Sequence, residues 1–430
     1  MRRGALLFFV ASAGIACAPG LLWARGPVGP EFQVNTYTTN RQDNVAIARS
    51  RNGTDFIVVW SSDGQDGSSG GVFGQRYTFF GGTPIGPEFR VNTQTTNTQR
   101  RPAVVIDDGG NFVVVWESGG QDGSSYGVFG QRFASTGAPL GPEFRVNTYT
   151  TLQQGYPAVA LGGNGDFIVV WNSNGPDGQD YGVFGQRYAA SGVPLGTEFQ
   201  INTYTTGYQA HPAIARFAGG PPSTEFMVVW TSYGQDGSSA GVFGQLFAAS
   251  GIPSGSEFRV NTFTTGHQGG ASIDAGFSSF VVVWSSLGQD GSDRGVFGQR
   301  YSGGFPSGSE FRVNTTTTGY QGGASVASDG GGHFVVVWSG DGQDGSSTGV
   351  FGQRYFSGAV PDGPEFRVNT YTTGAQELPA VAADIGTLGP GGRFVVAWRS
   401  YGQDGASHGV FGQRFGPIIV PVELINFRVE

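Results

Sequence analysis

Short hydrophobic runs separated by turn-forming residues recur along the chain from about residue 30 onwards. In one representative stretch the runs are 103–106, 112–116, 128–133 and 144–147, and all are rich in Val, Phe, Tyr or Ile. Each run is bounded by Gly, Pro, Asp, Asn or Ser, as β-strands require, and no stretch has a helical period with capping residues. The second run is continuously apolar, which predicts a strand buried on both faces. We name the four predicted strands of this unit A, B, C and D.

The four-strand unit is repeated seven times along the chain. A Trp ends strand B in every copy: Trp60, Trp116, Trp171, Trp230, Trp284, Trp338 and Trp398. The sequence Gly-Val-Phe-Gly-Gln then marks strand C, and Glu-Phe-(Arg/Gln)-(Val/Ile)-Asn-Thr marks strand D. The repeats start near residues 31, 88, 143, 198, 257, 310 and 365, and a partial eighth copy occupies 427–429.

Seven helix-free repeats of four strands predict an all-β fold, a seven-bladed β-propeller of four-stranded antiparallel blades. A string of small β-sandwiches is the alternative, but units of this size bury little surface alone, whereas a closed ring packs each sheet on two neighbours. We expect residues 26–430 to form this single domain. Because 32–35 and 427–429 share a repeat phase, one of them must close the ring as a D strand. Both chain ends are expected against the blade that holds Trp398.

The repeat resembles that of secreted bacterial tandem-repeat proteins, some of them large surface adhesins. The resemblance rests on the order Pro-Ala-Val-Ala, a strand ending in Trp, Gln-Asp-Gly-Ser, Gly-Val-Phe-Gly-Gln-Arg and Glu-Phe-Arg-Val-Asn-Thr, and covers residues 31–416. The layout is also similar to WD-repeat-like propellers and to the Tol-system translocation protein. The resemblance implies a propeller in the cell envelope or outside the cell, without a single activity.

Two polar residues recur on one face of the predicted ring. In an up-and-down blade the B–C loops and the D–A links emerge on the same face, which we call the BC face; the A–B and C–D loops form the AB face. An Asp follows each Trp by six positions: Asp66, Asp122, Asp177, Asp236, Asp290, Asp344 and Asp404. A Gln follows each D-strand Asn by seven positions: Gln42, Gln99, Gln154, Gln209, Gln268, Gln321 and Gln376. These residues are the candidate ligand-binding ring.

The recurring Asp has a structural and a metal-binding interpretation. Asp-Gly is strong turn chemistry, and the carboxylate can accept from nearby backbone N–H groups or brace a neighbouring Gln. Alternatively, Asp63 with Asp66, and Asp341 with Asp344, place two carboxylates three residues apart beside Ser, an arrangement that can contribute oxygen ligands to calcium. Calcium is therefore the one metal we consider, and no other cofactor is expected.

The other recurring residues have simpler expectations. The Trp residues are expected to pack between blades, near the small second Gly of strand C, rather than to stack on a sugar. The Glu of strand D and the Arg of strand C are expected to pair with each other. The four His residues sit at unrelated repeat positions without metal-ligand spacing, and no nucleophile elbow or phosphate-binding loop occurs. These observations predict a protein without enzyme activity.

Composition and the N-terminal sequence indicate which partners and which cellular compartment to expect. The net charge is −8 and Arg supplies all the basic residues, so nucleic acid is not an expected partner. Residues 1–25 read as a signal peptide, with Arg2 and Arg3 before an apolar run too short to span a bilayer, and with cleavage expected after Ala18 or Ala24. Cys17 is the only cysteine and weakly fits a lipoprotein signal, which makes lipidation the minor alternative. No later segment resembles a membrane span.

The sequence therefore predicts a secreted, periplasmic or cell-surface propeller that acts as a monomeric binding or adhesion module. Its partner is expected to be an extracellular glycan or protein, because repeated polar residues suit multivalent binding better than a single asymmetric active site. Two alternatives remain open at this stage: a secreted hydrolase or lyase with a central pocket, and a structural protein of the envelope.

Overall fold

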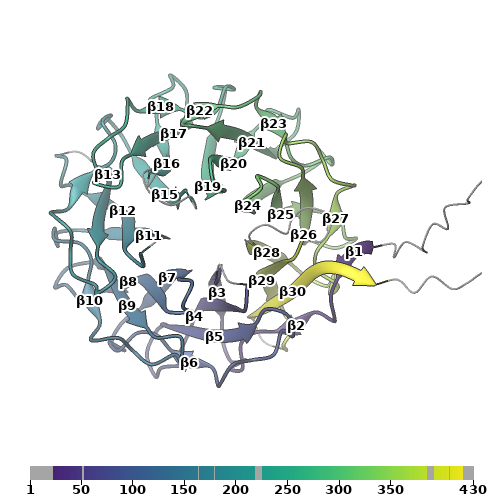
Figure 1. Cartoon of the computed structure of the whole chain (residues 1–430), viewed down its shortest axis with the longest axis horizontal. Helices are drawn as coiled ribbons and strands as arrows, with labels where there is room; N and C mark the ends of the chain where they lie inside the picture. The colour runs from purple at the N-terminus through teal and green to yellow at the C-terminus, as the bar shows by residue number, and fades with distance from the viewer. Residues whose placement is uncertain are drawn as a thin grey trace, which may run out of the picture.

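The computed structural model describes residues 23–50, 53–162, 164–178, 180–217, 225–384, 392–405 and 407–419. Seven antiparallel sheets stand around a central axis and form a closed ring (Figure 1). The prediction of a seven-bladed, all-β propeller is confirmed. Most of the predicted signal peptide with Cys17, and the partial repeat at 427–429, lie outside the described residues. Within the described part, no helix has the length and apolar character that a membrane crossing needs.

Each blade runs from strand A at the axis to strand D at the rim. Blade 1 contains β3 (Gln42–Arg49), β4 (Asp55–Ser62), β5 (Gly71–Thr78) and β6 (Phe89–Arg90). Blade 2 contains β7 (Gln99–Ile106), β8 (Phe112–Gly119), β9 (Tyr126–Phe133) and β10 (Phe144–Arg145). Blade 3 contains β11 (Gln154–Leu161), β12 (Phe167–Asn174), β13 (Tyr181–Tyr188) and β14 (Phe199–Gln200). Blade 4 contains β15 (Gln209–Arg216), β16 (Phe226–Tyr233), β17 (Ala240–Phe247) and β18 (Phe258–Arg259).

The remaining blades follow the same order with small additions. Blade 5 contains β19 (Gln268–Ala275), β20 (Ser279–Leu287), β21 (Arg294–Ser302), β22 (Phe305–Pro306) and β23 (Phe311–Arg312). Blade 6 contains β24 (Gln321–Ser328), β25 (Phe334–Asp341), β26 (Thr348–Tyr355) and β27 (Phe366–Arg367). Blade 7 contains β28 (Gln376–Ala383), β29 (Phe394–Tyr401) and β30 (His408–Ile419), completed by β1 (Trp23–Pro27) and β2 (Phe32–Gln33).

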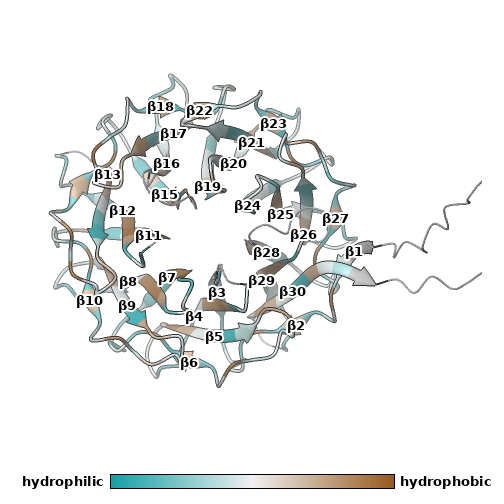
Figure 2. Cartoon of the chain, in the orientation of Figure 1, coloured by the Kyte–Doolittle hydropathy of each residue, from teal (hydrophilic) through white to brown (hydrophobic). Residues whose placement is uncertain are grey.

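The hydrophobic core lies between the blades. The side chains of the seven strand-B Trp residues are 0% exposed, which confirms that they are core residues and excludes them as sugar-stacking platforms. Trp230 of blade 4, for example, packs with Val170 and Val183 of blade 3. Figure 2 shows the hydrophobic colour on the strands that carry this packing, such as β3, β8 and β12. Each blade therefore needs its neighbours to bury the apolar faces of its strands.

The second Gly of strand C leaves room for a Phe ring, not for the Trp. At Gly130 an added Cβ atom would lie 2.7 Å from Cζ of Phe144, which belongs to strand D of the same blade. Phe144 pairs with Gly130 in register and contacts Tyr188 of the next blade, with ring centroids 5.4 Å apart. The Gly position therefore holds the outer strand and the adjacent blade together through one aromatic side chain.

The Glu of strand D tethers neighbouring blades. Glu143 of blade 2 accepts hydrogen bonds from the backbone N–H and the hydroxyl of Thr93, which follows strand D of blade 1. The same pair of bonds occurs at every interface of the ring, from Glu88 with Thr36 round to Glu31 with Thr370. The expected Glu–Arg pairing is wrong, because these Glu carboxylates bond Thr instead, while Arg76, for example, donates to the carbonyl oxygens of Ser135 and Thr136.

The N-terminal segment closes the ring. β2 pairs with β30 and supplies strand D of blade 7, while β1 pairs with the far part of β30. Figure 1 shows β1 and β30 side by side at the same edge. The chain therefore joins its first and last strands in the blade of Trp398, and β1 begins at Trp23, within the last residues of the predicted signal peptide.

Candidate functional site

The predicted ring of Asp and Gln residues forms part of the scaffold of the BC face. The seven Gln side chains are 0% exposed, and each donates to the carbonyl oxygen of a Thr three residues earlier, as Gln99 does to Thr96 at 2.9 Å. Asn92 donates to both Gln99, at 3.2 Å, and Asp66, at 3.4 Å, and thereby links three loops. The Asp side chains are half-buried and accept backbone N–H groups, for example that of Ser68. Their role as direct ligand contacts stays a prediction.

The paired carboxylates proposed for calcium have protein partners. Asp344 accepts from the N–H of Ser346 and from Asn369, and Asp341 accepts from the hydroxyl of Thr348 at 2.8 Å. Burial raises the pKa of Asp63, an effect that the charge of Arg41 opposes. Among the described residues no group of three or more His, Cys, Asp or Glu side chains is placed to hold a metal. Calcium binding stays a prediction that rests on the loop sequence.

Side chains that differ between the seven repeats gather on the BC face, where the inner strands begin near the axis. We call five positions together the variable ring. They are the residue before each buried Gln (Arg41, Thr98, Gln153, Tyr208, His267, Tyr320, Ala375), the residue two after it (Asn44, Arg101, Tyr156, His211, Gly270, Gly323, Leu378), the residue after each Trp (Ser61, Glu117, Asn172, Thr231, Ser285, Ser339, Arg399), the residue before each Gly-Val-Phe-Gly-Gln (Gly70, Tyr126, Tyr181, Ala240, Arg294, Thr348, His408), and the residue directly after each buried Gln (Asp43, Arg100, Gly155, Ala210, Gly269, Gly322, Glu377). The scaffold residues between them are nearly identical in all blades.

A β-bulge presents the second of these positions in every blade. Each inner strand shifts register just after the Gln, for example between Gly155 and Ala158, and the bulged residue has a positive φ. Five of the seven bulged residues are not Gly, and Tyr156 has φ 52°. The polar residue after the Trp of the preceding blade fixes several of these bulges: Glu117 accepts the N–H of Tyr156 at 2.7 Å. Strained residues held by such surroundings cluster at ligand sites.

Aromatic side chains of the variable ring, together with Tyr233, form an arc over blades 2 to 5. The rings of Tyr156 and His211 contact edge to face with centroids 4.2 Å apart. Tyr208 contacts Tyr181 at 4.5 Å and Tyr233 at 5.6 Å, and Tyr233 reaches His267 at 5.7 Å. All of these side chains are half-buried, so one face of the arc stays accessible. We call this set, with Tyr126, the aromatic arc.

Blade 2 contributes a charged group beside the arc. Glu117 is 0% exposed, and its carboxylate accepts from Nε of Arg100 at 2.9 Å and from Nη1 of Arg101 at 3.0 Å. The guanidinium of Arg100 lies 4.2 Å from the ring centroid of Tyr126, and that of Arg101 lies 4.0 Å from that of Tyr156. These cation–π contacts orient both cations against the aromatic arc.

The opposite part of the variable ring, in blades 7 and 1, is ionic rather than aromatic. Arg399 contacts Asp43 at 3.0 Å and Glu377 at 2.6 Å, so two carboxylates surround one half-buried cation. Arg41 contacts the same Asp43. These charges balance within the group and join blade 7 to blade 1 across the ring closure.

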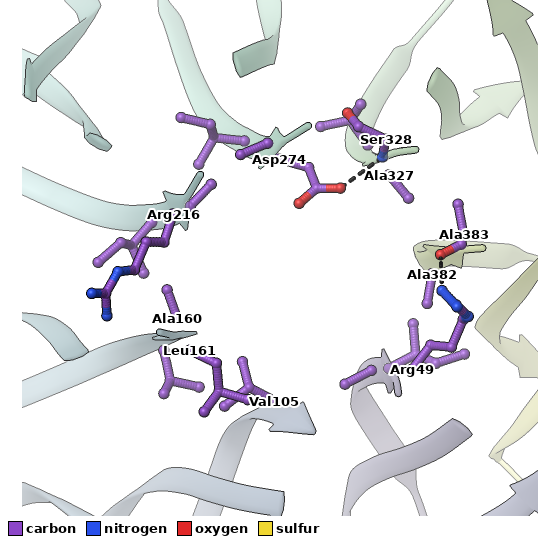
Figure 3. Close-up of a pocket in the computed structure, with 18 of the residues that line it drawn as sticks. Arg49, Val105, Ala160, Leu161, Arg216, Asp274, Ala327, Ser328, Ala382 and Ala383 are labelled. Atoms are coloured by element: carbon purple, nitrogen blue, oxygen red, sulfur yellow. Dashed lines mark hydrogen bonds between the residues drawn. The ribbon is translucent and has the colours of Figure 1, made fainter. Parts of the chain in front are cut away.

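An axial cavity lies at the AB face, where the inner strands end. The last three residues of the seven inner strands line an axial cavity of ≈ 250 Å³ (Figure 3). Small and apolar residues such as Ala160 and Val105 make up most of its wall. The charged residues there engage neighbouring blades: Asp274 accepts the N–H of Ser328 at 2.6 Å, and Arg49 donates to the carbonyl of Ala383 at 2.8 Å. The residues that line this cavity are thus chemically more uniform than those of the variable ring on the BC face.

His211 gives the aromatic arc a defined response to pH. Burial lowers the pKa of His211, and the positive charge of Arg101 lowers it further, so the imidazole is neutral at pH 7. Since the unfolded chain binds the proton more readily, we expect the free energy of unfolding to fall as the pH drops below the ordinary His value of about 6.5. His211→Asn, which keeps a residue that tolerates positive φ, should reduce that fall; urea unfolding at pH 7 and pH 5 measures the difference. An equal pH slope in both proteins would contradict this assignment.

The comparisons with known proteins concern the fold. No protein-family model and no curated protein matches the chain. A protein of unknown function from Dyadobacter fermentans has a similar structure, with 9% identity and a TM-score of 0.51, covering 93% of this chain and 100% of that one. An ulvan lyase, from a new family of polysaccharide lyases, has 12% identity and a TM-score of 0.49 over 92% of this chain and 96% of its own. An α-L-arabinanase from Penicillium chrysogenum, complexed with arabinobiose, has 13% identity and a TM-score of 0.49 over 90% and 98%.

These structures correct one prediction. The expectation that the chain has no enzyme activity does not stand, since solved structures similar to it include a polysaccharide lyase and an arabinanase. At 12–13% identity they show the fold alone and assign no reaction to this chain.

The sequence interpretation emphasised residues that are the same in every repeat, and the variable ring lies on the same BC face as these residues. The seven identical Asp and Gln residues stood out because they repeat, whereas the bulged residues and the aromatic arc stand out because they vary at fixed repeat positions. Variation between otherwise matching copies was the available signal. The close contacts among Arg101, Tyr156 and His211 required the structure, because these residues lie in three different blades.

Proposed function

We propose that this protein is a secreted or surface-exposed binding propeller that holds a glycan on the aromatic arc of its BC face. One observation carries the proposal: the half-buried residues of the aromatic arc vary between repeats and gather on the BC face, whereas the scaffold around them is the same in every repeat. The leader-like N-terminus and the resemblance to secreted bacterial repeat proteins support a location in or outside the envelope. A single ring, without a second copy, suffices for the proposed site.

Aromatic rings beside hydrogen-bonding groups suit a sugar. A pyranose ring presents apolar C–H faces that pack on an aromatic side chain and hydroxyl groups that need polar partners. In the aromatic arc, Tyr156 and Tyr208 supply such ring faces. Asn172, the variable-ring residue after the Trp of blade 3, is fully buried, and both amide atoms lack a protein hydrogen-bond partner in the described part of the chain. A buried amide of this kind is stabilised when it bonds a hydroxyl group.

A glycan array with the mature chain tests the proposal, and matched variants locate the site. Tyr156→Asn places at the bulge the residue that occupies the same position in blade 1, Asn44, so the backbone keeps its positive φ. We expect this variant to bind the best array ligand about tenfold more weakly, through the loss of ring stacking. Calorimetric titration measures the affinity, and chromatography of the titrated glycan shows any cleavage.

The control for this experiment is Leu378→Asn. Leu378 occupies the equivalent bulge in blade 7, with φ 51° and 43% exposure, outside the aromatic arc. It should keep the affinity of the unmodified protein. Equal losses in both variants, or an array without any bound glycan, would count against a glycan site on the arc and favour a structural role in the envelope.

A further inference from the structure

We infer that Arg100 and Arg101 form an anion subsite on the variable ring that takes the carboxylate or sulfate group of an acidic glycan. This inference rests on the proposed glycan site and adds the chemical class of the ligand. It starts from the arrangement of two cations around a single buried anion in blade 2.

The charges of this group do not balance. Glu117 is the one carboxylate that Arg100 and Arg101 contact in ion pairs of the described chain, and it pairs with both. Two arginines and one glutamate leave one net positive charge. The two guanidinium groups are accessible to a ligand, because the side chains of Arg100 and Arg101 are 30% and 28% exposed. The protein as a whole has a net charge of −8, so this local excess is contrary to the general charge of the molecule.

Hydrogen-bond donors are also left over. Arg100 bonds Glu117 through Nε, and Arg101 bonds it through Nη1. A guanidinium carries five N–H donors in a planar fork that matches the oxygens of a carboxylate or sulfate. The other nitrogens of these two side chains make no hydrogen bond with the described part of the protein. They are therefore available to two oxygens of one ligand group.

The subsite is held in place before a ligand arrives. Arg100 stacks on Tyr126 and Arg101 stacks on Tyr156, while the buried Glu117 holds both guanidinium groups through its ion pairs. The bulge at Arg101 is itself tied to the preceding blade, because its N–H donates to the hydroxyl of Ser61 at 3.1 Å. A preorganised pair of cations loses little side-chain entropy when it binds an anion, which favours affinity.

The contrast with blade 7 shows why we assign the anion subsite to Arg100 and Arg101 rather than to Arg399. Arg399, another cation of the variable ring, contacts two carboxylates, the buried Asp43 and the half-buried Glu377. Its charge is already compensated. An acidic ligand lying along the aromatic arc would therefore place its anionic group at blade 2 and not at blade 7.

Calorimetric titration of the mature chain with matched oligosaccharides tests the inference. The probes are oligogalacturonate and its carboxyl-reduced counterpart, and a sulfated galactan oligomer and its desulfated counterpart. We expect at least one acidic oligomer to bind ten- to a hundredfold more tightly than its neutral counterpart, as charge-assisted hydrogen bonds require. The two pairs distinguish a carboxylate from a sulfate as the recognised group. Raising the salt concentration should reduce the difference.

Variants assign the effect to the two arginines. Arg101→Asn keeps a residue suited to positive φ, and Arg100→Gln keeps the Arg101–Glu117 pair, so at least one of them is expected to fold with an unchanged melting temperature. Each should lower the preference for the acidic oligomer about tenfold or more. Arg145→Gln is the control, because Arg145 is exposed on the outer strand β10 of the same blade and its loss changes the net charge equally.

The outcomes separate this inference from the proposed function. Equal affinity for acidic and neutral oligomers, abolished by Tyr156→Asn, would overturn the anion subsite and keep the glycan site. An acidic preference that survives in Arg100→Gln and Arg101→Asn, or that Arg145→Gln reduces equally, would also overturn it. No binding of any oligomer would overturn both. A preference lost in the two arginine variants alone would establish the subsite.

Discussion

Trp230→Ala is expected to lower the free energy of unfolding by about 3–5 kcal/mol, the cost of removing a fully buried Trp from a core. Trp230 lies in strand β16 of blade 4 and packs in one cluster with residues of blade 3, among them Val170 and Val183. The cavity would therefore open between two blades rather than within one sheet. Because every interface of a closed ring must form together, the loss should appear as an earlier transition of the whole molecule. Urea unfolding followed by fluorescence and circular dichroism measures it.

The control for this substitution is an aromatic residue at the surface. Tyr401 follows the Trp of blade 7 by three positions and is 52% exposed. Tyr401→Ala should change the free energy of unfolding by no more than about 0.5 kcal/mol, as surface substitutions usually do. A Trp230→Ala protein as stable as Tyr401→Ala would mean that the blades do not share a core.

Gly130→Val is expected to cost about 3 kcal/mol or more, because the added side chain has no space. Its Cβ would lie 2.7 Å from Cζ of Phe144, and the branched methyl groups would push further into the same ring. Phe144 is held on one side by its pairing with strand C and on the other by Tyr188 of blade 3. Displacing it removes the outer strand of blade 2 and part of the next interface. Thermal unfolding followed by circular dichroism measures the effect.

Gly244 provides the matched comparison at the same repeat position in blade 4. There an added Cβ would first meet the Cε methyl of Met227 at 3.2 Å and Phe258 at 3.3 Å. A flexible Met side chain can move at lower cost than a ring clamped between two blades. Gly244→Val should therefore cost clearly less than Gly130→Val. Equal costs would show that the aromatic contact of strand D does not control packing at this Gly.

Much of the fold could be predicted from sequence because the determining signals are local and repeated. Strand B contains one Trp in every copy, and although the strand continues two or three residues past this Trp, the Gly, Pro and Asp-Gly residues around it mark where the strands lie. The number of blades followed from counting these markers. The partners of the recurring polar residues did not, because the Glu–Thr tether joins residues about fifty positions apart in neighbouring blades and no short sequence pattern contains both.

The candidate site was less predictable for a related physical reason. Gly or Asn usually occupies a β-bulge position with positive φ. In this protein Arg101, Tyr156, His211 and Leu378 adopt that conformation. Packing from the preceding blade, not local preference, imposes that conformation. The sequence shows which positions vary, and the structure shows that the varying positions of different blades meet.

Hydrogen–deuterium exchange with and without a bound glycan is the most direct test of a division between scaffold residues and a variable ring. Bound ligand should slow exchange in the segments around Arg101, Tyr156, Tyr208 and His211, at the BC mouth of blades 2 to 4. The equivalent segments of blade 7 around Leu378, and the inner-strand ends at the AB cavity, should exchange at unchanged rates. Protection spread equally over all seven blades, or confined to the AB cavity, would contradict the division.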